Sequence, residues 1–447
     1  MSKKYIPGFA ILVLVAIIGL FDVDAGGAVV ADANIDGADT AWMLAATGLV
    51  LLMTPGLSFF YGGMVSRKNV ISTMLQSFIC MGVITLVWVA GGFSLAFGDS
   101  IGGVIGDPRT FAFFKGVGGA TQADLVPTIP FILFALFQMK FAIITPALIT
   151  GSFAERIRFS SFVLFIILFS VIIYSPLAHM TWHPDGFLRK WGVLDFAGGT
   201  VVHMSAGFAA IAAAIILGKR KNHGSAHKPA NIPFVLLGTG LLWFGWFGFN
   251  AGSALGANSD AAMAFATTTV ASAAAMLAWV FYDALMGRKI SGLGASIGAV
   301  VGLVAITPAA GFVTIGQSVF IGVAGAVVSN IVVYYKNKTG IDDTLDVFPC
   351  HGVGGIVGMI LTGVFAKEVG LIYGDPTTFL RHMAAVFLVG AFTFGGSYLL
   401  FKLTDLIIPM RVNEVAEEIG LDISQHGESM SKSASPEKIA EMMKKAS

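Results

Sequence analysis

The sequence predicts an all-α polytopic membrane protein with eleven transmembrane helices, arranged as a five-plus-five inverted repeat and one further helix. Hydrophobic residues make up 56% of the 447 residues and charged residues only 12%, whereas soluble proteins carry about 25% charged residues. Apolar runs of about 20 residues, the length that crosses a bilayer, recur between glycines, prolines and charges. The 55 glycines suit close packing between membrane helices.

The predicted spans lie near residues 40–63, 71–98, 128–150, 159–179, 197–218, 231–254, 261–286, 291–308, 315–335, 348–366 and 381–404. Alternate loops between them differ in charge. One set carries twelve Lys and Arg residues, beginning with Arg67 and Lys68, and the other set carries six. Because cytoplasmic loops are enriched in Lys and Arg, the first set is predicted to be cytoplasmic. The N-terminus is then outside and the C-terminus inside.

Residues 1–25 have the pattern of a secretory signal peptide that is cleaved. Lys3 and Lys4 precede a short apolar run near residues 6–21, and small residues end the segment at Ala25. The alternative is a first span that stays attached, but the run is short for a span and acidic residues follow it. We therefore predict a periplasmic segment at 26–39, an eleven-span membrane domain at 40–404 and a cytoplasmic tail at 405–447.

The composition argues against several other classes of protein. The formal charge is +1 and no Lys/Arg block is present, so nothing points to nucleic acid. Cys80 and Cys350 lie in or beside apolar runs, which does not suggest a disulfide framework or a cysteine metal site. An intramembrane enzyme built on His and Asp would need a nucleophile–base spacing or a motif such as HExxH, and the sequence has neither. We expect no catalytic residue, cofactor or metal.

Two histidines interrupt the fifth and tenth predicted spans. The fifth begins DFAGGTVVHMSAG with Asp195 and His203, and the tenth begins DVFPCHGVGGIVG with Asp346 and His351. At about 1.5 Å per residue, the histidines lie roughly 12 Å and 8 Å from the starts of their helices. These helices run in opposite directions in an inverted repeat, so the histidines are predicted to meet near the membrane midplane.

Ionisable groups inside a bilayer are costly and by default mark a transport pathway. Burial disfavours the imidazolium form, so we expect a neutral pair or a pair that shares one proton. The alternative is that each histidine is only a polar group satisfied by a neighbouring helix. A zinc site is disfavoured because no third ligand accompanies the pair at a suitable spacing.

Asp195 precedes the fifth span and has two compatible interpretations. Its carboxylate is well placed to cap the helix by accepting hydrogen bonds from the first backbone N–H groups. A negative charge near the outer mouth would also help to hold a cation.

Aromatic residues gather in two further stretches and beside the fourth span. Phe137 and Phe141 are spaced i and i+4 in LFQMKFAIITPAL, and Phe249 and Ser253 have the same spacing in WFGWFGFNAGSA. Such stripes are more often packing than binding sites. Trp182, just outside the fourth span, favours a binding role because aromatic faces attract small cations.

Four long stretches carry a family resemblance: DFAGGTVVHMSAGFAAIAAAIILGKR, FAIITPALITGSFAERIRFS, GWFGFNAGSALGAN and DVFPCHGVGGIVGMILTG. They are similar to the Amt/Rh family of ammonium transporters, specifically to its bacterial Amt branch. The likeness extends from about residue 40 to residue 428. It implies a homotrimer in the cell inner (cytoplasmic) membrane, with one ammonium pore in each subunit.

The resemblance also implies roles for individual residues. Trp182, Ser253 and Phe137 match an outer site that recruits ammonium, and Asp195 matches the buried aspartate beside it. Phe141 and Phe249 match two stacked rings that close the outer vestibule, and His203 and His351 match twin histidines in the pore below. Two departures stand out: the segment from Trp182 to Asp195 is one residue longer than the family pattern, and Lys140 lies between the two matched phenylalanines of the third span.

Physical chemistry supports a matching mechanism. The sequence contains no TVGYG carbonyl filter, and an apolar pore would impose a large desolvation cost on any ion. Ammonium can avoid this cost by releasing a proton near the phenyl gate and crossing as ammonia. We expect proton co-transport, which makes transport electrogenic, although the sequence does not reveal the relay.

The tail RVNEVAEEIGLDISQHGES has a rough helical spacing of apolar residues. The resemblance implies that it packs under the trimer and helps to receive a PII-type regulatory protein. Two alternatives keep the fold: an ammonium sensor that barely conducts, and a Rh-type channel for neutral gas. Sensors of this family often carry a fused signalling domain, and a Rh-type channel would be expected to lack Trp182 and Ser253.

Overall fold

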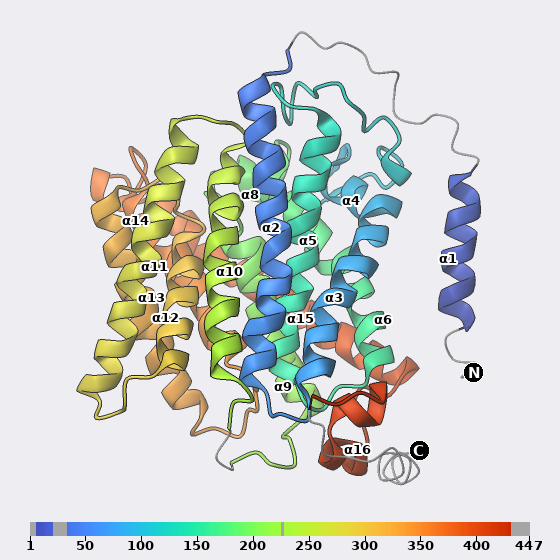
Figure 1. Ribbon diagram of the computed structural model, residues 1–447. Helices are drawn as coiled ribbons and strands as arrows, with labels where there is room; N and C mark the ends of the chain where they lie inside the picture. Colours follow the sequence, from blue (N-terminus) through green and yellow to red (C-terminus); the bar gives the residue numbers. More distant parts are fainter. Residues whose placement is uncertain (1–5, 21–33, 225–227, 431–447) are drawn as a thin grey trace.

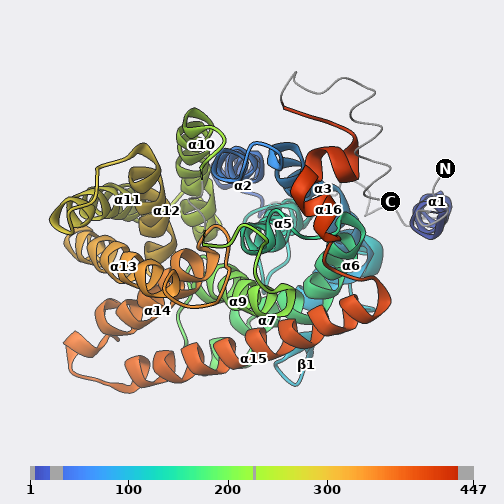
Figure 2. The ribbon, with the colours of Figure 1, turned by 90° about the horizontal axis from the view of Figure 1, so that it is seen from below.

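The structure is a computed structural model, and it describes residues 6–20, 34–224 and 228–430. Most of these residues are helical, and the long helices stand side by side in one bundle (Figure 1). Helix α1 (Ile6–Gly19) lies apart from the bundle in two perpendicular views (Figures 1 and 2). The predicted cleavage site near Ala25 falls outside the described residues.

The first half of the bundle comprises α2 (Gly37–Met64), α3 (Val70–Val87), η2 (Trp88–Gly92), α4 (Phe93–Phe97), α5 (Phe131–Phe153), α6 (Phe159–Phe169), η4 (Ser170–Tyr174), α7 (Ser175–Trp182), α8 (Phe187–Lys190), η5 (Gly199–Met204) and α9 (Ser205–Leu217). A small antiparallel hairpin of β1 (Ser100–Ile101) and β2 (Ile105–Gly106), followed by η3 (Ala112–Phe114), lies between α4 and α5.

The second half comprises α10 (Ile232–Ala251), η6 (Gly252–Ala254), α11 (Ser259–Leu285), α12 (Gly292–Ile306), α13 (Ile315–Lys336), η7 (Phe348–Val353), α14 (Gly354–Phe365), η8 (Leu371–Tyr373) and α15 (Thr377–Ile407). The tail adds α16 (Glu414–Ile419) and η9 (Asp422–His426). Five of the described elements are π-helical: η9 in the tail, and η2, η4, η5 and η7, which lie within longer helices of the two halves.

Ten helical stretches in the described residues are long and apolar enough to cross a membrane. Each overlaps one of the predicted spans, so the prediction of a multi-pass membrane protein is confirmed. The remaining predicted span, 291–308, corresponds to α12, which is apolar but has only 15 residues.

Close packing of small residues holds the bundle together. A Cβ atom added to Gly63 would lie 2.6 Å from the carbonyl oxygen of Asn231, and one added to Gly238 would collide with the backbone of Phe60. Helices α2 and α10 therefore approach to backbone contact, as expected of glycine at membrane helix interfaces. The same principle joins α9 to η7, because a Cβ on Gly207 would overlap the Cα of Gly352.

Side-chain caps set the starts of several helices. Asp36 accepts hydrogen bonds from the N–H groups of Ala38 and Asp39 at the start of α2. Thr314 and Gln317 form a reciprocal capping box at the start of α13. These residues satisfy N–H groups that have no partner within the helix.

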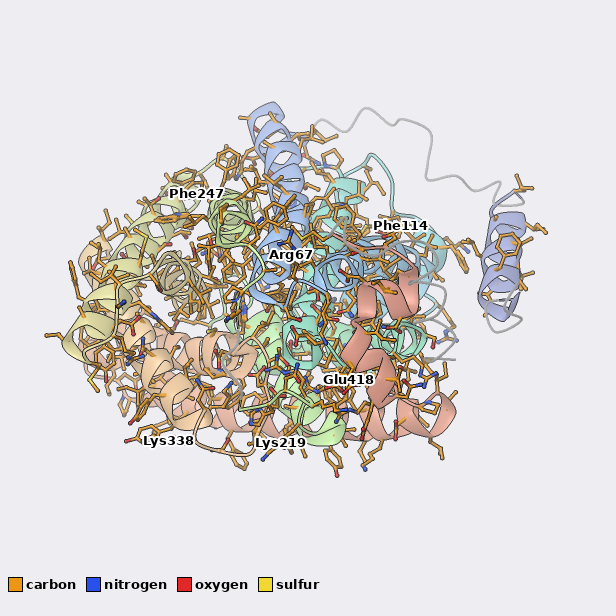
Figure 3. All side chains as sticks on the ribbon, turned by 60° about the horizontal axis from the view of Figure 1, so that its bottom comes forward. Arg67, Phe114, Lys219, Phe247, Lys338 and Glu418 are labelled. Carbon is orange, nitrogen blue, oxygen red and sulfur yellow. The ribbon has the colours of Figure 1, made fainter. Side chains whose placement is uncertain are left out.

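The tail packs against the end of the bundle that carries the richer set of basic loops. Arg67, Lys219, Lys338 and Glu418 gather on this end (Figure 3). The expected helical segment of the tail is present as α16 and η9.

Candidate functional site

Three cavities lie one after another along a path through the bundle. The path runs through the first half and along the contact between the first half and the second half. The outer cavity has a volume of about 300 Å³ and is lined by residues that include Phe141, Trp182 and Ser253. The middle cavity, of about 10 Å³, is lined by Phe249, His203 and His351 among apolar side chains. That is room for about one water-sized molecule. The inner cavity, also of about 10 Å³, shares Val300 and His351 with the middle one.

One face of α5 supplies the outer cavity with Phe134, Gln138 and Phe141. Their spacing of i, i+4 and i+7 is that of a single helical face. Phe137 is not in this lining. It is fully buried behind the face, with its ring centroid 5.0 Å from that of Phe141. The two phenylalanines therefore have different positions: Phe141 faces the cavity, and Phe137 packs against the ring of Phe141.

Asp195 caps η5 with both carboxylate oxygens. Its Oδ1 accepts hydrogen bonds from the N–H groups of Gly198 at 2.8 Å and Gly199 at 2.7 Å. Its Oδ2 accepts from the N–H of Thr200 at 2.7 Å and from the Thr200 hydroxyl. The predicted cap is confirmed. The residue is also 8% exposed and lies in the lining of the outer cavity.

Trp182 is held across the cavity by two contacts. Its indole N–H donates to the backbone oxygen of Asp195 at 3.1 Å, and its own carbonyl accepts from Arg189 at 2.6 Å. The Trp182 ring meets Phe141 edge to face at 5.8 Å. Ser253 donates its hydroxyl hydrogen to the carbonyl of Phe249 at 2.8 Å, so its oxygen lone pairs remain able to accept.

Two phenyl rings separate the outer from the middle cavity. Phe141 and Phe249 have ring centroids 4.2 Å apart and an interplanar angle of 32°. Phe141 lines the outer cavity and Phe249 lines the middle one. Both side chains are almost completely buried. Passage between the cavities therefore requires these rings to move.

The two histidines meet in the middle cavity. Their Nδ1 atoms are 3.3 Å apart, a hydrogen bond in which one ring donates and the other accepts. His203 lies parallel to Trp246, with centroids 5.3 Å apart. The Nε2 atom of His203 is buried and has no hydrogen-bond partner within the described part of the chain. The Nε2 atom of His351 likewise forms no hydrogen bond with the described residues. The arrangement suits a neutral pair with two unsatisfied nitrogens in an apolar cavity.

The cap of η7 is Asp343 and not Asp346, which the sequence led us to pair with Asp195. Asp343 accepts a hydrogen bond from the N–H of Phe348 at 2.7 Å, five residues on, as Asp195 does from Thr200. Asp346 has a positive φ of 59° and forms an ion pair with Lys336 at 2.6 Å. The sequence does contain the spacing that the structure uses. Asp195 precedes His203 by eight residues, and Asp343 precedes His351 by eight residues.

Charged residues surround the inner end of this path. The Arg156 guanidinium is buried and donates to the carbonyl of Asp342 at 2.6 Å and to Thr344 at 2.7 Å. Arg220 pairs with Asp342 at 2.9 Å and with Glu155 at 3.1 Å. Burial alone would raise the pKa of Asp342, but its hydrogen bonds and ion pairs with arginine hold that pKa well below its usual range. Burial lowers the pKa of Arg156 to about 10.

The tail is attached to the same end through Glu417 and Asp422. Glu417 accepts from the N–H of Lys221 and from Arg411 at 2.8 Å. Asp422 accepts from the N–H of Ser72 at 2.7 Å in the first turn of α3. Burial raises the pKa of Asp422, opposed by these backbone hydrogen bonds.

Four polar residues that line the outer cavity were not predicted from the sequence: Asp124, Gln138, Thr181 and Arg189. Gln138 directly follows Phe137, but its residue type alone gave no signal of a site. Lys140, whose charge could not be placed from the sequence, is half-buried on α5 and lies outside the lining of the three cavities.

Comparison with known proteins agrees with the resemblance. Residues 41–431 match the model of the Ammonium Transporter Family. An ammonium transporter of Aquifex aeolicus is 47% identical over 404 residues, 89% of this chain and 94% of that protein. One of Bacillus subtilis is 45% identical over 400 residues, 87% of this chain and 97% of that protein.

Solved structures agree as well. The crystal structure of Saccharomyces cerevisiae Mep2 superposes with a TM-score of 0.83 at 33% identity, over 90% of this chain and 94% of that one. A structure described as a sensor Amt protein has a TM-score of 0.80 at 30% identity, over 87% and 98% of the two chains. From its helical architecture, its sequence and these likenesses, the chain belongs to the Ammonium Transporter Family.

Proposed function

We propose that this protein transports ammonium across the cytoplasmic membrane and carries it as ammonia through the middle cavity. The observation that carries the proposal is the histidine pair, whose two Nε2 atoms have no partner within the described residues and lie in an otherwise apolar constriction. The names of the relatives supply the substrate, since those of Aquifex aeolicus and Bacillus subtilis are called ammonium transporters.

The outer cavity is proposed to recruit the cation. Trp182 and Phe141 offer aromatic surface that attracts a small cation, and Ser253 offers a hydroxyl oxygen. Asp195 is proposed to attract the cation through its charge while it caps η5, and not to bind the cation directly, because four hydrogen bonds already occupy its oxygens. Phe137 is proposed to support the Phe141 ring and not to touch the cation.

The narrow middle cavity distinguishes ammonium from potassium. An ion that entered it would lose nearly all of its water, and apolar walls would not replace that hydration. Ammonium releases a proton to water in the outer cavity, before the gate formed by Phe141 and Phe249, and ammonia then enters as a small neutral molecule. The free Nε2 atoms of the His203–His351 pair can bond to it and compensate for lost hydration. Co-transport of the proton would make the process electrogenic.

The remaining assignments follow the same proposal. Eleven spans, including α12, form a five-plus-five inverted repeat, supported by the aspartate–histidine spacing that recurs at η5 and η7. The excess of Lys and Arg at the tail end supports an N-terminus outside and a C-terminus inside. We further propose a cleaved signal peptide at 1–25, a periplasmic segment at 26–39, a transporter domain at 40–404 and a regulatory tail at 405–447. The subunits form a homotrimer, and a PII-type protein binds at the cytoplasmic face.

A sensor is the second candidate, because one similar structure is described as a sensor Amt protein. Current measurements on the purified protein in planar lipid bilayers or supported membranes separate the two functions. A transporter gives a saturating ammonium current, a methylammonium current and no potassium current. Ammonium binding without any ammonium flux would support the sensor, and flux of neutral ammonia that never saturates would support a Rh-type channel.

A further inference from the structure

Gln138 is a buried polar side chain whose amide has no partner among the residues that the structure describes. It lies on α5 one turn before Phe141, is 8% exposed and lines the outer cavity. Its amide forms no hydrogen bond with any residue in the described ranges. A buried amide is costly unless a ligand or water satisfies it. On this face of α5, Gln138 lines the outer cavity.

The lining of the cavity also contains the exposed carboxylate of Asp124 and the hydroxyl of Thr181, which has no hydrogen-bond partner in the described residues. Both oxygens of Asp195 are occupied by the first turn of η5. Arg189 brings a guanidinium, which can only donate. Ser253 can accept, and the amide oxygen of Gln138 is a further side-chain acceptor in the same cavity, on α5 beside Phe141. The aromatic surfaces of Phe141 and Trp182 attract a cation but do not provide directed hydrogen-bond acceptors.

We propose that Gln138 is a further ligand of ammonium in the outer cavity and a determinant of its selectivity, an inference that rests on the proposed function. Its amide oxygen accepts one N–H of the cation, while Ser253 accepts another and the rings of Phe141 and Trp182 cover the remainder. Ammonium directs four hydrogen bonds, whereas potassium has none to donate. Oxygen atoms also coordinate potassium, so the discrimination rests on direction: acceptors fixed along N–H bonds of ammonium, with aromatic surface in place of further oxygens, favour ammonium over potassium.

The test replaces the amide and leaves the length of the side chain. Gln138→Met is expected to raise the KM for ammonium current about tenfold, the effect of one hydrogen bond to a charged group, while the maximal current changes little. Gln138→Glu keeps an acceptor and adds charge, so it is expected to restore tight ammonium binding and to increase inhibition by potassium. A purely structural role would lower the maximal current and would not change selectivity.

Gln76→Met is the matched control. Gln76 on α3 is 1% exposed and its amide oxygen also lacks a partner within the described residues, but it lines none of the three cavities. This variant is expected to retain the KM of the wild type. Thermal unfolding of each variant in detergent shows whether the fold is intact.

Ammonium binding measured by isothermal titration calorimetry distinguishes failure of the proposed transport function from failure of the proposed role of Gln138. If the wild type binds ammonium but carries no current, transport is refuted and Gln138→Met still reports on the ligand role through its dissociation constant. If the wild type conducts and Gln138→Met has the wild-type KM, dissociation constant and selectivity, the role of Gln138 is refuted alone. If the wild type neither binds nor conducts ammonium, both proposals fail.

Discussion

Replacing Asp195 by asparagine tests the link between the outer cavity and the start of η5. The carboxylate accepts two backbone N–H groups on Oδ1, and a third together with a hydroxyl on Oδ2. Asparagine has one oxygen, so its NH₂ group must face one of these two sets of donors. It costs less for the NH₂ group to face Thr200, because the Thr200 hydroxyl can rotate and accept a hydrogen bond from it. The backbone N–H of Thr200 then has no acceptor.

This geometry sets the size of the effect. A buried N–H left without a partner costs about 1–3 kcal/mol, and loss of the negative charge at a helix N-terminus costs about 0.3–1 kcal/mol more. Asp195→Asn is thus expected to destabilise the protein by roughly 1–4 kcal/mol. Thr200→Val removes only the hydroxyl bond, so about 0.5–1.5 kcal/mol is expected. Asp343→Asn leaves an oxygen to accept from Phe348 and is expected to cost less than Asp195→Asn.

Reversible unfolding in mixed micelles measures these differences, and ammonium current is recorded on the same preparations. The expected order of destabilisation is Asp195→Asn, then Thr200→Val. The loss of charge is also expected to raise the KM for ammonium in Asp195→Asn but not in Thr200→Val. Equal stability of Asp195→Asn and the wild type would refute the capping argument. A changed stability with an unchanged KM would refute the electrostatic role alone.

Three further changes have defined outcomes. His203→Ala removes one of the two unsatisfied nitrogens and enlarges the middle cavity, so ammonium current in liposomes should persist only with loss of selectivity against potassium; unchanged selectivity would oppose the proposed role. Phe141→Ala opens the outer constriction and should raise water permeability measured by stopped-flow light scattering, whereas an unchanged value would show that the rings do not limit passage. Arg220→Met should destabilise the protein by the same amount from pH 8 to pH 5. Because the folded pKa of Asp342 lies below its unfolded value of 3.8, the contribution of this ion pair is present above that value and is lost as pH falls through the folded pKa. A difference between variant and wild type that already shrinks between pH 8 and pH 5 would contradict this assignment.

The sequence was sufficient to predict the positions of the spans and the meeting of the two histidines. Long apolar runs have few alternatives in a membrane, and ionisable residues within them are rare. The cap at Asp195 was predictable for a related reason, because an aspartate directly before an apolar helix has N–H donors at a known distance. These predictions depend on local patterns and on the chemistry of the bilayer.

The aspartate at the start of the tenth span shows what such patterns leave open. The chain reverses at Asp346 with a positive φ, and η7 begins as a π-helix whose cap reaches five residues ahead. Simple N-capping rules expect a reach of two or three residues, so they select the nearer aspartate. Phe137 illustrates a second limit. Its spacing to Phe141 identifies a shared side of the helix, but the neighbouring helices decide which of the residues on α5 face the cavity.

The inner end of the molecule links the tail to the histidine pair through hydrogen bonds between consecutive segments. The backbone of Arg156 accepts from the N–H of Val412 in the tail, and its guanidinium donates to the carbonyl of Asp342. The next residue, Asp343, caps the helix that carries His351. A displacement of the tail would therefore strain the loop that sets the start of η7. Because the tail is joined by these hydrogen bonds to the cap of η7, the proposed partner at α16 and η9 would act on the loop that positions His351.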